Sequence, residues 1–207
     1  MKQLPNLLTA LRLVLSLAMF GALALVGAGL AGVAGGPALA RFSFVAFVVA
    51  AITDFFDGWL ARRWGVVSMA GAILDPIADK VLVCGAILGL LGVGAPGVLV
   101  PGGLILFREF AVSALREVLA PRGIKLPVTF LAKAKTTLQL VALGAIMLVW
   151  FWPAWRIDAR IDHLREALDA AVLLFDLAAI VTLWTGVDYA WSAWIALKAA
   201  ANPPAAE

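Results

Sequence analysis

Long stretches without a charged residue constrain this chain more than any other feature. Leu13–Ala40, Val81–Phe107 and Leu138–Trp155 contain no Asp, Glu, Lys or Arg, and 64% of all residues are hydrophobic. Each stretch is long enough to cross about 30 Å of hydrocarbon as a helix. The stretches are roughly twice as long as a membrane β-strand and do not alternate in polarity. Because helices satisfy their own backbone in lipid, the sequence predicts an all-α integral membrane protein.

Three further apolar segments carry charged residues inside them. They are Phe42–Ala61, Val98–Ala120 and Ala170–Leu197. Together with the uncharged stretches they predict six transmembrane helices in a single domain of residues 1–200, with a short N-terminal interfacial segment and a flexible tail at 201–207. The charged segment Asp158–Glu166 is expected to form a short helix along the membrane surface.

The basic residues are unevenly distributed between the two ends of these spans. If the N-terminus lies in the cytoplasm, twelve Lys and Arg residues fall on that side and four fall on the other. Lys and Arg are retained on the cytoplasmic side of membrane proteins. The sequence therefore predicts a multi-pass protein with an inside N-terminus, which has membrane lipids and no nucleic acid as partners.

Four aspartates stand out in this apolar background. Asp54 and Asp57 are three residues apart and Asp75 and Asp79 are four apart, so each pair shares one face of a helix. Four ionised carboxylates at a membrane boundary repel one another and need protons or cations. Hard oxygen ligands favour Mg²⁺, Mn²⁺ or Ca²⁺, and two divalent ions would balance the charge. Two such ions typically clamp the attacking and leaving oxygens in phosphoryl displacement.

Small residues and an arginine lie between the two aspartate pairs. Gly58, Ala61 and Gly71 could leave room for a ligand, or could simply let membrane helices approach closely. Arg62 carries a guanidinium fork that suits a diphosphate, whereas Arg63 is more typical of a head-group anchor.

The complete pattern is D-x2-D-G-x2-A-R-x8-G-x3-D-x3-D, which covers 26 residues from Asp54 to Asp79. It resembles the signature of the CDP-alcohol phosphotransferase family with no position missing. The resemblance implies six transmembrane helices with an active site near the cytoplasmic surface. It also implies transfer of a substituted phosphate from a CDP-linked donor to an acceptor hydroxyl, with release of CMP.

The resemblance also implies roles for individual residues. Asp54, Asp57 and Asp75 would hold two Mg²⁺ or Mn²⁺ ions, and Asp79 would share a metal or act as general base. The CDP group would be surrounded by Gly58, Ala61, Arg62 and Gly71, with the polar face of Asn6, Thr9 and Arg12 near the nucleotide.

A second polar cluster bears on the acceptor. It contains Arg108-Glu109, Arg116-Glu117, Lys133 and Lys135. Some of these cations can pair with the two glutamates, but Lys133 and Lys135 have no nearby acid in the sequence, which leaves positive charge for a phosphate. A phosphorylated acceptor is therefore favoured over serine or choline.

The stretches "REFAVSALRE" and "KAKTTLQ" are similar to those of bacterial family members that use sn-glycerol 3-phosphate, and the similarity extends through Leu143. It implies that CDP-diacylglycerol and sn-glycerol 3-phosphate give phosphatidylglycerophosphate and CMP, in a homodimer of the bacterial inner membrane. The candidates for binding the acceptor phosphate are Arg108, Arg116, Lys133, Lys135 and Thr136. One departure is Ala132, where glycine is expected in that branch.

Other functions remain open at this point. Within the family, an enzyme with an inositol-phosphate acceptor or a cardiolipin synthase would share the donor chemistry. A cation transporter is an alternative from another class, because buried acids often mark ion paths. A transporter would spread its acids across the membrane depth and break its helices near the midplane, whereas these acids gather beside basic residues.

Overall fold

The computed structural model describes residues 4–64, 69–124, 130–157 and 161–201. Within these ranges it describes the backbone but not the side chains of residues 4–5, 55–64, 69–73, 130, 132–133, 161–162 and 200–201. The described residues form helices and turns without a strand. The elements in chain order are α1 (Leu4–Gly27), α2 (Gly32–Trp64), α3 (Met69–Gly92), α4 (Leu99–Leu119), the 3₁₀ turn η1 (Ala120–Arg122), α5 (Phe130–Trp150), the 3₁₀ turn η2 (Trp152–Trp155) and α6 (Ile161–Ala201). The all-α prediction is confirmed.

Two of the predicted spans are divided differently in the structure. The stretch Leu13–Ala40 is not one helix, because α1 ends at Gly27 and α2 begins at Gly32. Gly29 and Gly32 have φ of 69° and 63°, a left-handed backbone that ends a helix and that glycine adopts easily. The stretch Val81–Phe107 is likewise split, since α3 ends at Gly92 and α4 begins at Leu99.

The segment Asp158–Glu166 does not form a separate surface helix. Residues 158–160 lie outside the described part of the chain, and α6 runs without interruption from Ile161 to Ala201, over 41 residues. The charged residues at its start are therefore the first turns of the longest helix. The proposed tail at 201–207 lies almost entirely beyond the described residues, since α6 ends at Ala201.

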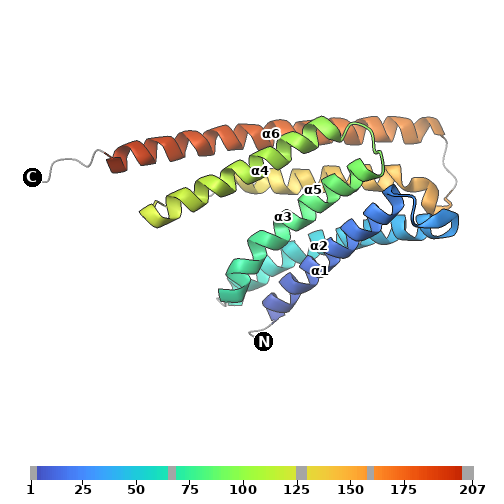
Figure 1. Ribbon diagram of the computed structural model, residues 1–207, viewed down its shortest axis with the longest axis horizontal. Helices are drawn as coiled ribbons and strands as arrows, with labels where there is room; N and C mark the ends of the chain where they lie inside the picture. The colour runs from blue at the N-terminus through green and yellow to red at the C-terminus, as the bar shows by residue number, and fades with distance from the viewer. Residues whose placement is uncertain (1–3, 65–68, 125–129, 158–160, 202–207) are drawn as a thin grey trace, which may run out of the picture.

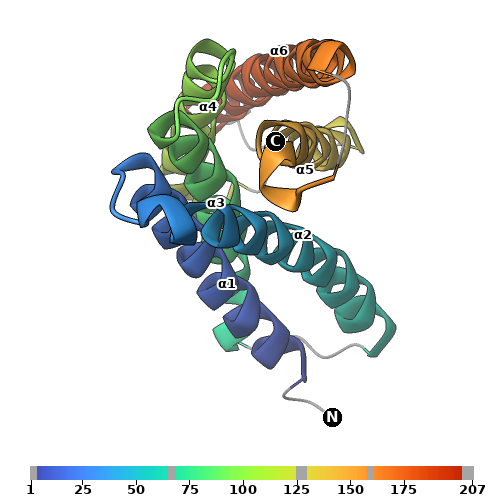
Figure 2. The ribbon, with the colours of Figure 1, turned by 90° about the vertical axis from the view of Figure 1, so that its right-hand side faces the viewer.

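The helices form two groups. Helix α1 packs along α2 and α3, while α6 packs along α4 and α5. Figures 1 and 2 show α1, α2 and α3 on one side of the molecule and the long α6, with α4 and α5, on the other. The groups meet where α2 and α3 contact α5, where α3 contacts α4, and where α2 contacts η2. Helices α4 and α5 each pack on α6, and long side chains join α4 to α5.

The core and the outer surface are both apolar. The interior contains Met19, Leu23, Phe47, Ile87, Leu143 and Phe175, all at most 2% exposed. Large apolar side chains also cover the outside, including Val14, Val33, Leu99, Trp184 and Trp191. Such a surface is stable in lipid and would be unfavourable in water. Three segments of the described chain have the length and hydropathy to cross a membrane, namely Asn6–Gly27, Gly32–Asp54 and His163–Ala199. The count of six spans stays a prediction.

Successive helices run in alternating directions. The first turns of α1, α3 and α5 therefore lie at the same end of the molecule as the last turns of α2, α4 and α6, toward the left of Figure 1. The aspartates occur in the second half of α2 and the first half of α3, and the second polar cluster extends from the middle of α4 to its last turn and includes residues early in α5. The fold thus brings both predicted clusters to the same half of the helix bundle.

Candidate active site

Three aspartates converge on one buried arginine. Arg12 of α1 is 1% exposed, and its Nη1 forms ion pairs with Asp54 Oδ1 and Asp79 Oδ1. Its Nη2 lies 3.5 Å from Asp75 Oδ1. Carboxylates from the second half of α2 and the first half of α3, 25 residues apart in the case of Asp54 and Asp79, thus face the same guanidinium. The structure thus brings Asp54 of α2 together with Asp75 and Asp79 of α3.

The first turns of α1 supply the polar face opposite these acids. Thr9 and Arg12 are three residues apart and so lie on one side of the helix. Thr9 Oγ1 donates a hydrogen bond of 2.6 Å to Asp75 Oδ1. Ser16, one turn further on, donates to the Arg12 carbonyl at 2.7 Å. Thr9 and Arg12 are both buried, whereas Asn6 is partly exposed.

The donor atoms at this site suit a hard divalent cation. Asp54, Asp75 and Asp79 offer only carboxylate oxygens, which favour Mg²⁺ or Mn²⁺ over zinc. Their three negative charges exceed the single positive charge of Arg12, so binding of a further cation would bring these four side chains closer to neutrality. As arranged, no three Asp, Glu, His or Cys side chains in the described chain form a group ready to hold a metal. In this arrangement the Arg12 guanidinium lies among the three carboxylates.

Several predicted site residues have side chains outside the description. Their helices are nevertheless defined: α2 carries Asp57, Gly58, Ala61 and Arg62, and α3 carries Gly71. Asp57 follows Asp54 by nearly one turn of α2, as its predicted role requires. The roles assigned to these five residues stay predictions.

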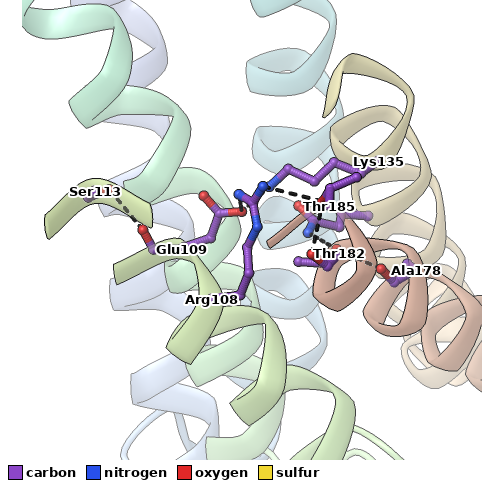
Figure 3. A network of polar contacts seen from close by, with 8 residues as sticks. Arg108, Glu109, Ser113, Lys135, Ala178, Thr182 and Thr185 are labelled. Carbon is purple, nitrogen blue, oxygen red and sulfur yellow. Dashed lines mark hydrogen bonds and ion pairs between the residues drawn. The ribbon is translucent and has the colours of Figure 1, made fainter. Parts of the chain in front are cut away.

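A second network joins α4, α5 and α6 (Figure 3). Glu109 of α4 accepts from two cations, Arg108 at 3.2 Å and Lys135 of α5, through the same Oε1 atom. Arg108 Nη2 also donates to Thr185 Oγ1 of α6 at 3.3 Å. Arg108 is 7% exposed and Lys135 is 5% exposed. Two buried cations share one carboxylate, which leaves one net positive charge.

This network corrects one step of the sequence reasoning. Lys135 is not without an acid, since it pairs with Glu109, which lies 26 residues earlier in the chain. Arg116 is exposed, and its guanidinium lies over the Tyr189 ring, 5.4 Å from the centroid. Thr136 is partly buried, and the side chain of Lys133 lies outside the described part. Their predicted role as acceptor-phosphate ligands is neither strengthened nor removed by these contacts.

The α6 residues of this network were not predicted from the sequence. Thr182 and Thr185 are buried, and Gln139 of α5 donates to Thr182 Oγ1 at 2.6 Å. The available signal was weak: two hydroxyl residues three positions apart within an otherwise apolar segment. Such residues usually bond to their own helix, so their spacing alone does not indicate a site.

The acids around Arg12 and the buried cations around Glu109 belong to one all-helical bundle, and comparison with known sequences shows the class of protein to which such a chain belongs. The chain belongs to the CDP-alcohol phosphatidyltransferase family, whose model matches residues 2–184. Enzymes of this family are generally dependent on divalent metals.

Named relatives give a more particular similarity. The chain is 40% identical to the CDP-diacylglycerol–glycerol-3-phosphate 3-phosphatidyltransferase of Salmonella typhimurium (strain LT2) over 150 residues, which cover 71% of this chain and 75% of the relative. It is 40% identical over 146 residues to the enzyme of the same name from Escherichia coli (strain K12), covering 69% and 73%. It is 50% identical over 109 residues to that of Cereibacter sphaeroides, covering 52% and 49%.

Proposed function

We propose that this protein transfers the phosphatidyl group of CDP-diacylglycerol to sn-glycerol 3-phosphate, which gives phosphatidylglycerophosphate and releases CMP. The observation that carries the proposal is the convergence of Asp54, Asp75 and Asp79 in a chain of this family. The names of the relatives supply the acceptor. The reaction is a step of phospholipid biosynthesis.

The donor site would lie between α1, α2 and α3. Asp54, Asp57, Asp75 and Asp79 would hold two Mg²⁺ or Mn²⁺ ions, which when bound would neutralise the carboxylates and the charge on the departing CMP. The nucleotide would be contacted by Asn6, Thr9, Gly58, Ala61, Arg62 and Gly71. Thr9 and Arg12 support this assignment, because they already face the acids with hydrogen-bond donors.

In the reaction, the acceptor hydroxyl oxygen forms a bond to the lipid-linked phosphorus as the bond from phosphorus to CMP breaks. Asp79 would accept the hydroxyl proton as general base, or would serve as a ligand for one of the ions. A base must lie within hydrogen-bond reach of the proton it removes. Asp79 is 46% exposed despite its contact with Arg12, so the carboxylate is open to an incoming substrate.

The acceptor site would lie among α4, α5 and α6. Arg108 and Lys135 are buried and carry one positive charge in excess of Glu109, which favours a phosphorylated acceptor. Arg116, Lys133 and Thr136 would complete the contacts. A neutral acceptor such as serine would not compensate this buried charge.

We further place this chain as one catalytic domain, residues 1–200, in the bacterial inner membrane, with its active end toward the cytoplasm and a second copy as partner. The bias of Lys and Arg along the sequence supports the orientation. Both polar clusters lie in the same half of the bundle, as an active site open to one leaflet requires. A transporter would instead need charged groups distributed across the membrane depth.

The test is an acceptor assay with protein purified in detergent. With CDP-diacylglycerol and Mg²⁺ or Mn²⁺, we expect CMP release when glycerol 3-phosphate is added. Inositol phosphate, phosphatidylglycerol and serine serve as the competing acceptors. CMP release with one of these alone would move the assignment to another branch of the family, and no CMP release with any acceptor would leave the transporter as the better hypothesis.

A further inference from the structure

Arg108 is held in part from α6, a helix to which the proposed function assigns no residue. Its Nη2 donates to Thr185 Oγ1 at 3.3 Å, and its Nη1 faces Glu109 Oε1 at 3.2 Å. Its Nε is buried and has no hydrogen-bond partner among the described residues. A buried guanidinium N–H is costly to leave unpaired. Arg108 therefore has a fixed direction and a remaining donor.

The Thr185 hydroxyl can only accept from Arg108. Its single proton is directed to the Thr182 carbonyl, at 2.9 Å. A hydroxyl has one donor and two acceptor positions, so with the proton engaged an acceptor position faces the guanidinium. Thr182 is bound differently: its hydroxyl donates to the Ala178 carbonyl and accepts from Gln139, both at 2.6 Å. Thr182 thus joins α5 to α6, and none of its hydroxyl's hydrogen bonds involves Arg108.

The next residue, Gly186, makes room for the stem of Arg108. A Cβ at this position would lie 2.7 Å from Arg108 Cγ and 3.4 Å from its Nε. Because Cγ is near the base of the side chain, the arginine could not yield by moving its tip alone. Glycine at 186 and hydroxyl at 185 thus determine together where the guanidinium lies (Figure 3 shows Arg108 and Thr185).

We propose that Thr185 and Gly186 are positioning residues for Arg108 and that they set the affinity of the enzyme for the phosphate of its acceptor. This inference rests on the proposed function. Glu109 cannot balance both Arg108 and Lys135, so an acceptor phosphate is the group that completes the network. Its binding then depends on the direction of Arg108, which α6 controls.

Helix packing is the competing explanation for a buried threonine, since hydroxyls commonly join membrane helices. The two roles predict different kinetics. Loss of packing lowers the stability of the protein and changes KM for both substrates alike. Loss of positioning raises KM for glycerol 3-phosphate and leaves KM for CDP-diacylglycerol and kcat nearly unchanged, because binding is weakened equally in the ground and transition states.

The experiment measures CMP release by purified Thr185→Val, Thr185→Ser and Gly186→Ala proteins, with each substrate varied in turn, together with their thermal unfolding. We expect roughly a tenfold rise in KM for glycerol 3-phosphate for Thr185→Val, in line with loss of a hydrogen bond to a charged group. Thr185→Ser should restore a value within about twofold of wild type. Gly186→Ala should raise the same KM, which keeps the test available if Thr185→Val does not fold.

Matched controls exist for both changes. Ser43→Ala removes a buried hydroxyl that donates to the Leu39 carbonyl of its own helix α2, and Gly103→Ala adds a methyl group on α4 where no atom lies within 4 Å. Both should keep KM for glycerol 3-phosphate near wild type. An unchanged KM in Thr185→Val and Gly186→Ala, a failure of serine to rescue, or an equal rise in KM for CDP-diacylglycerol would overturn the inference. Wild-type protein inactive with glycerol 3-phosphate would instead refute the proposed function.

Discussion

Arg12 and Asp54 form an ion pair that joins the first turns of α1 to the second half of α2, across 42 residues of sequence. The arginine is 1% exposed and the aspartate 35% exposed. A buried cation is stable only with close counter-charges. Asp79 and Asp75 provide two further counter-charges for Arg12, so this part of the bundle is organised around one guanidinium and three carboxylates.

Replacing Arg12 should destabilise the protein most when metal is absent. In Arg12→Gln the three acids lose their cation, and we expect the free energy of unfolding to fall by about 1–3 kcal/mol, less than for a fully buried pair because the acids are partly exposed. The measurement is thermal unfolding in detergent with EDTA and again with Mg²⁺, which should reduce the difference from wild type. Arg122→Gln, at an exposed arginine, is the control. Equal melting temperatures for Arg12→Gln and wild type in EDTA would contradict the role of Arg12 as counter-charge.

Asp79→Asn should abolish most of the activity. The amide keeps the shape of the carboxylate but cannot accept the hydroxyl proton or neutralise a metal, so CMP release should fall at least about 100-fold. Stability should change little, because one negative charge is removed from a crowded acidic cluster. Asp169→Asn, at an exposed acid near the start of α6, should retain wild-type activity. Substantial CMP release by Asp79→Asn would exclude both roles proposed for Asp79.

Removal of divalent metal should stop the reaction reversibly. With EDTA we expect CMP release to disappear, and Mg²⁺ or Mn²⁺ to restore it, because the carboxylate oxygens at the site are hard ligands. Zn²⁺ should restore little activity, since the described site offers neither sulfur nor imidazole. Full activity in the presence of EDTA would show that Arg12 and the other cations suffice.

Glu109→Gln should weaken the fold and strengthen the response to phosphate. The change leaves Arg108 and Lys135 buried without a carboxylate, which should cost about 3 kcal/mol of unfolding free energy. Inorganic phosphate should then raise the melting temperature more than it does in wild type, because it replaces the missing charge. Glu117→Gln, at an exposed acid two turns further along α4, is the control. A melting temperature that does not respond to the Glu109 change would mean that the ion pairs contribute nothing.

The aspartate cluster could be predicted because charge is rare in this chain. In an apolar sequence, each acid needs a compensating group, and spacings of three and four residues place the pairs on helix faces. The helix class followed from the same lack of charge. Helix ends were harder, because hydrophobicity does not change where α1 stops and α2 begins. The break between the two helices depends on the positive φ angles of Gly29 and Gly32. A glycine in the sequence allows such an angle but does not require it.

Partners far apart in the sequence could not be predicted. Lys135 seemed free because no acid lies near it along the chain, yet the packing of α4 and α5 on α6 brings Glu109 to it. Thr185 likewise contacts an arginine 77 residues away. Periodicity tells which face of a helix a residue occupies, but not which helix that face meets.

The division of the bundle into two groups of helices has a consequence for how such enzymes can diversify. The acids proposed for the donor site belong to α2 and α3 and face Arg12 of α1, and the cations proposed for the acceptor belong to α4 and α5, braced by α6. New acceptors can therefore arise through changes in the second group while the first is left intact. A hybrid chain joined in the 93–98 connection would separate the two specificities.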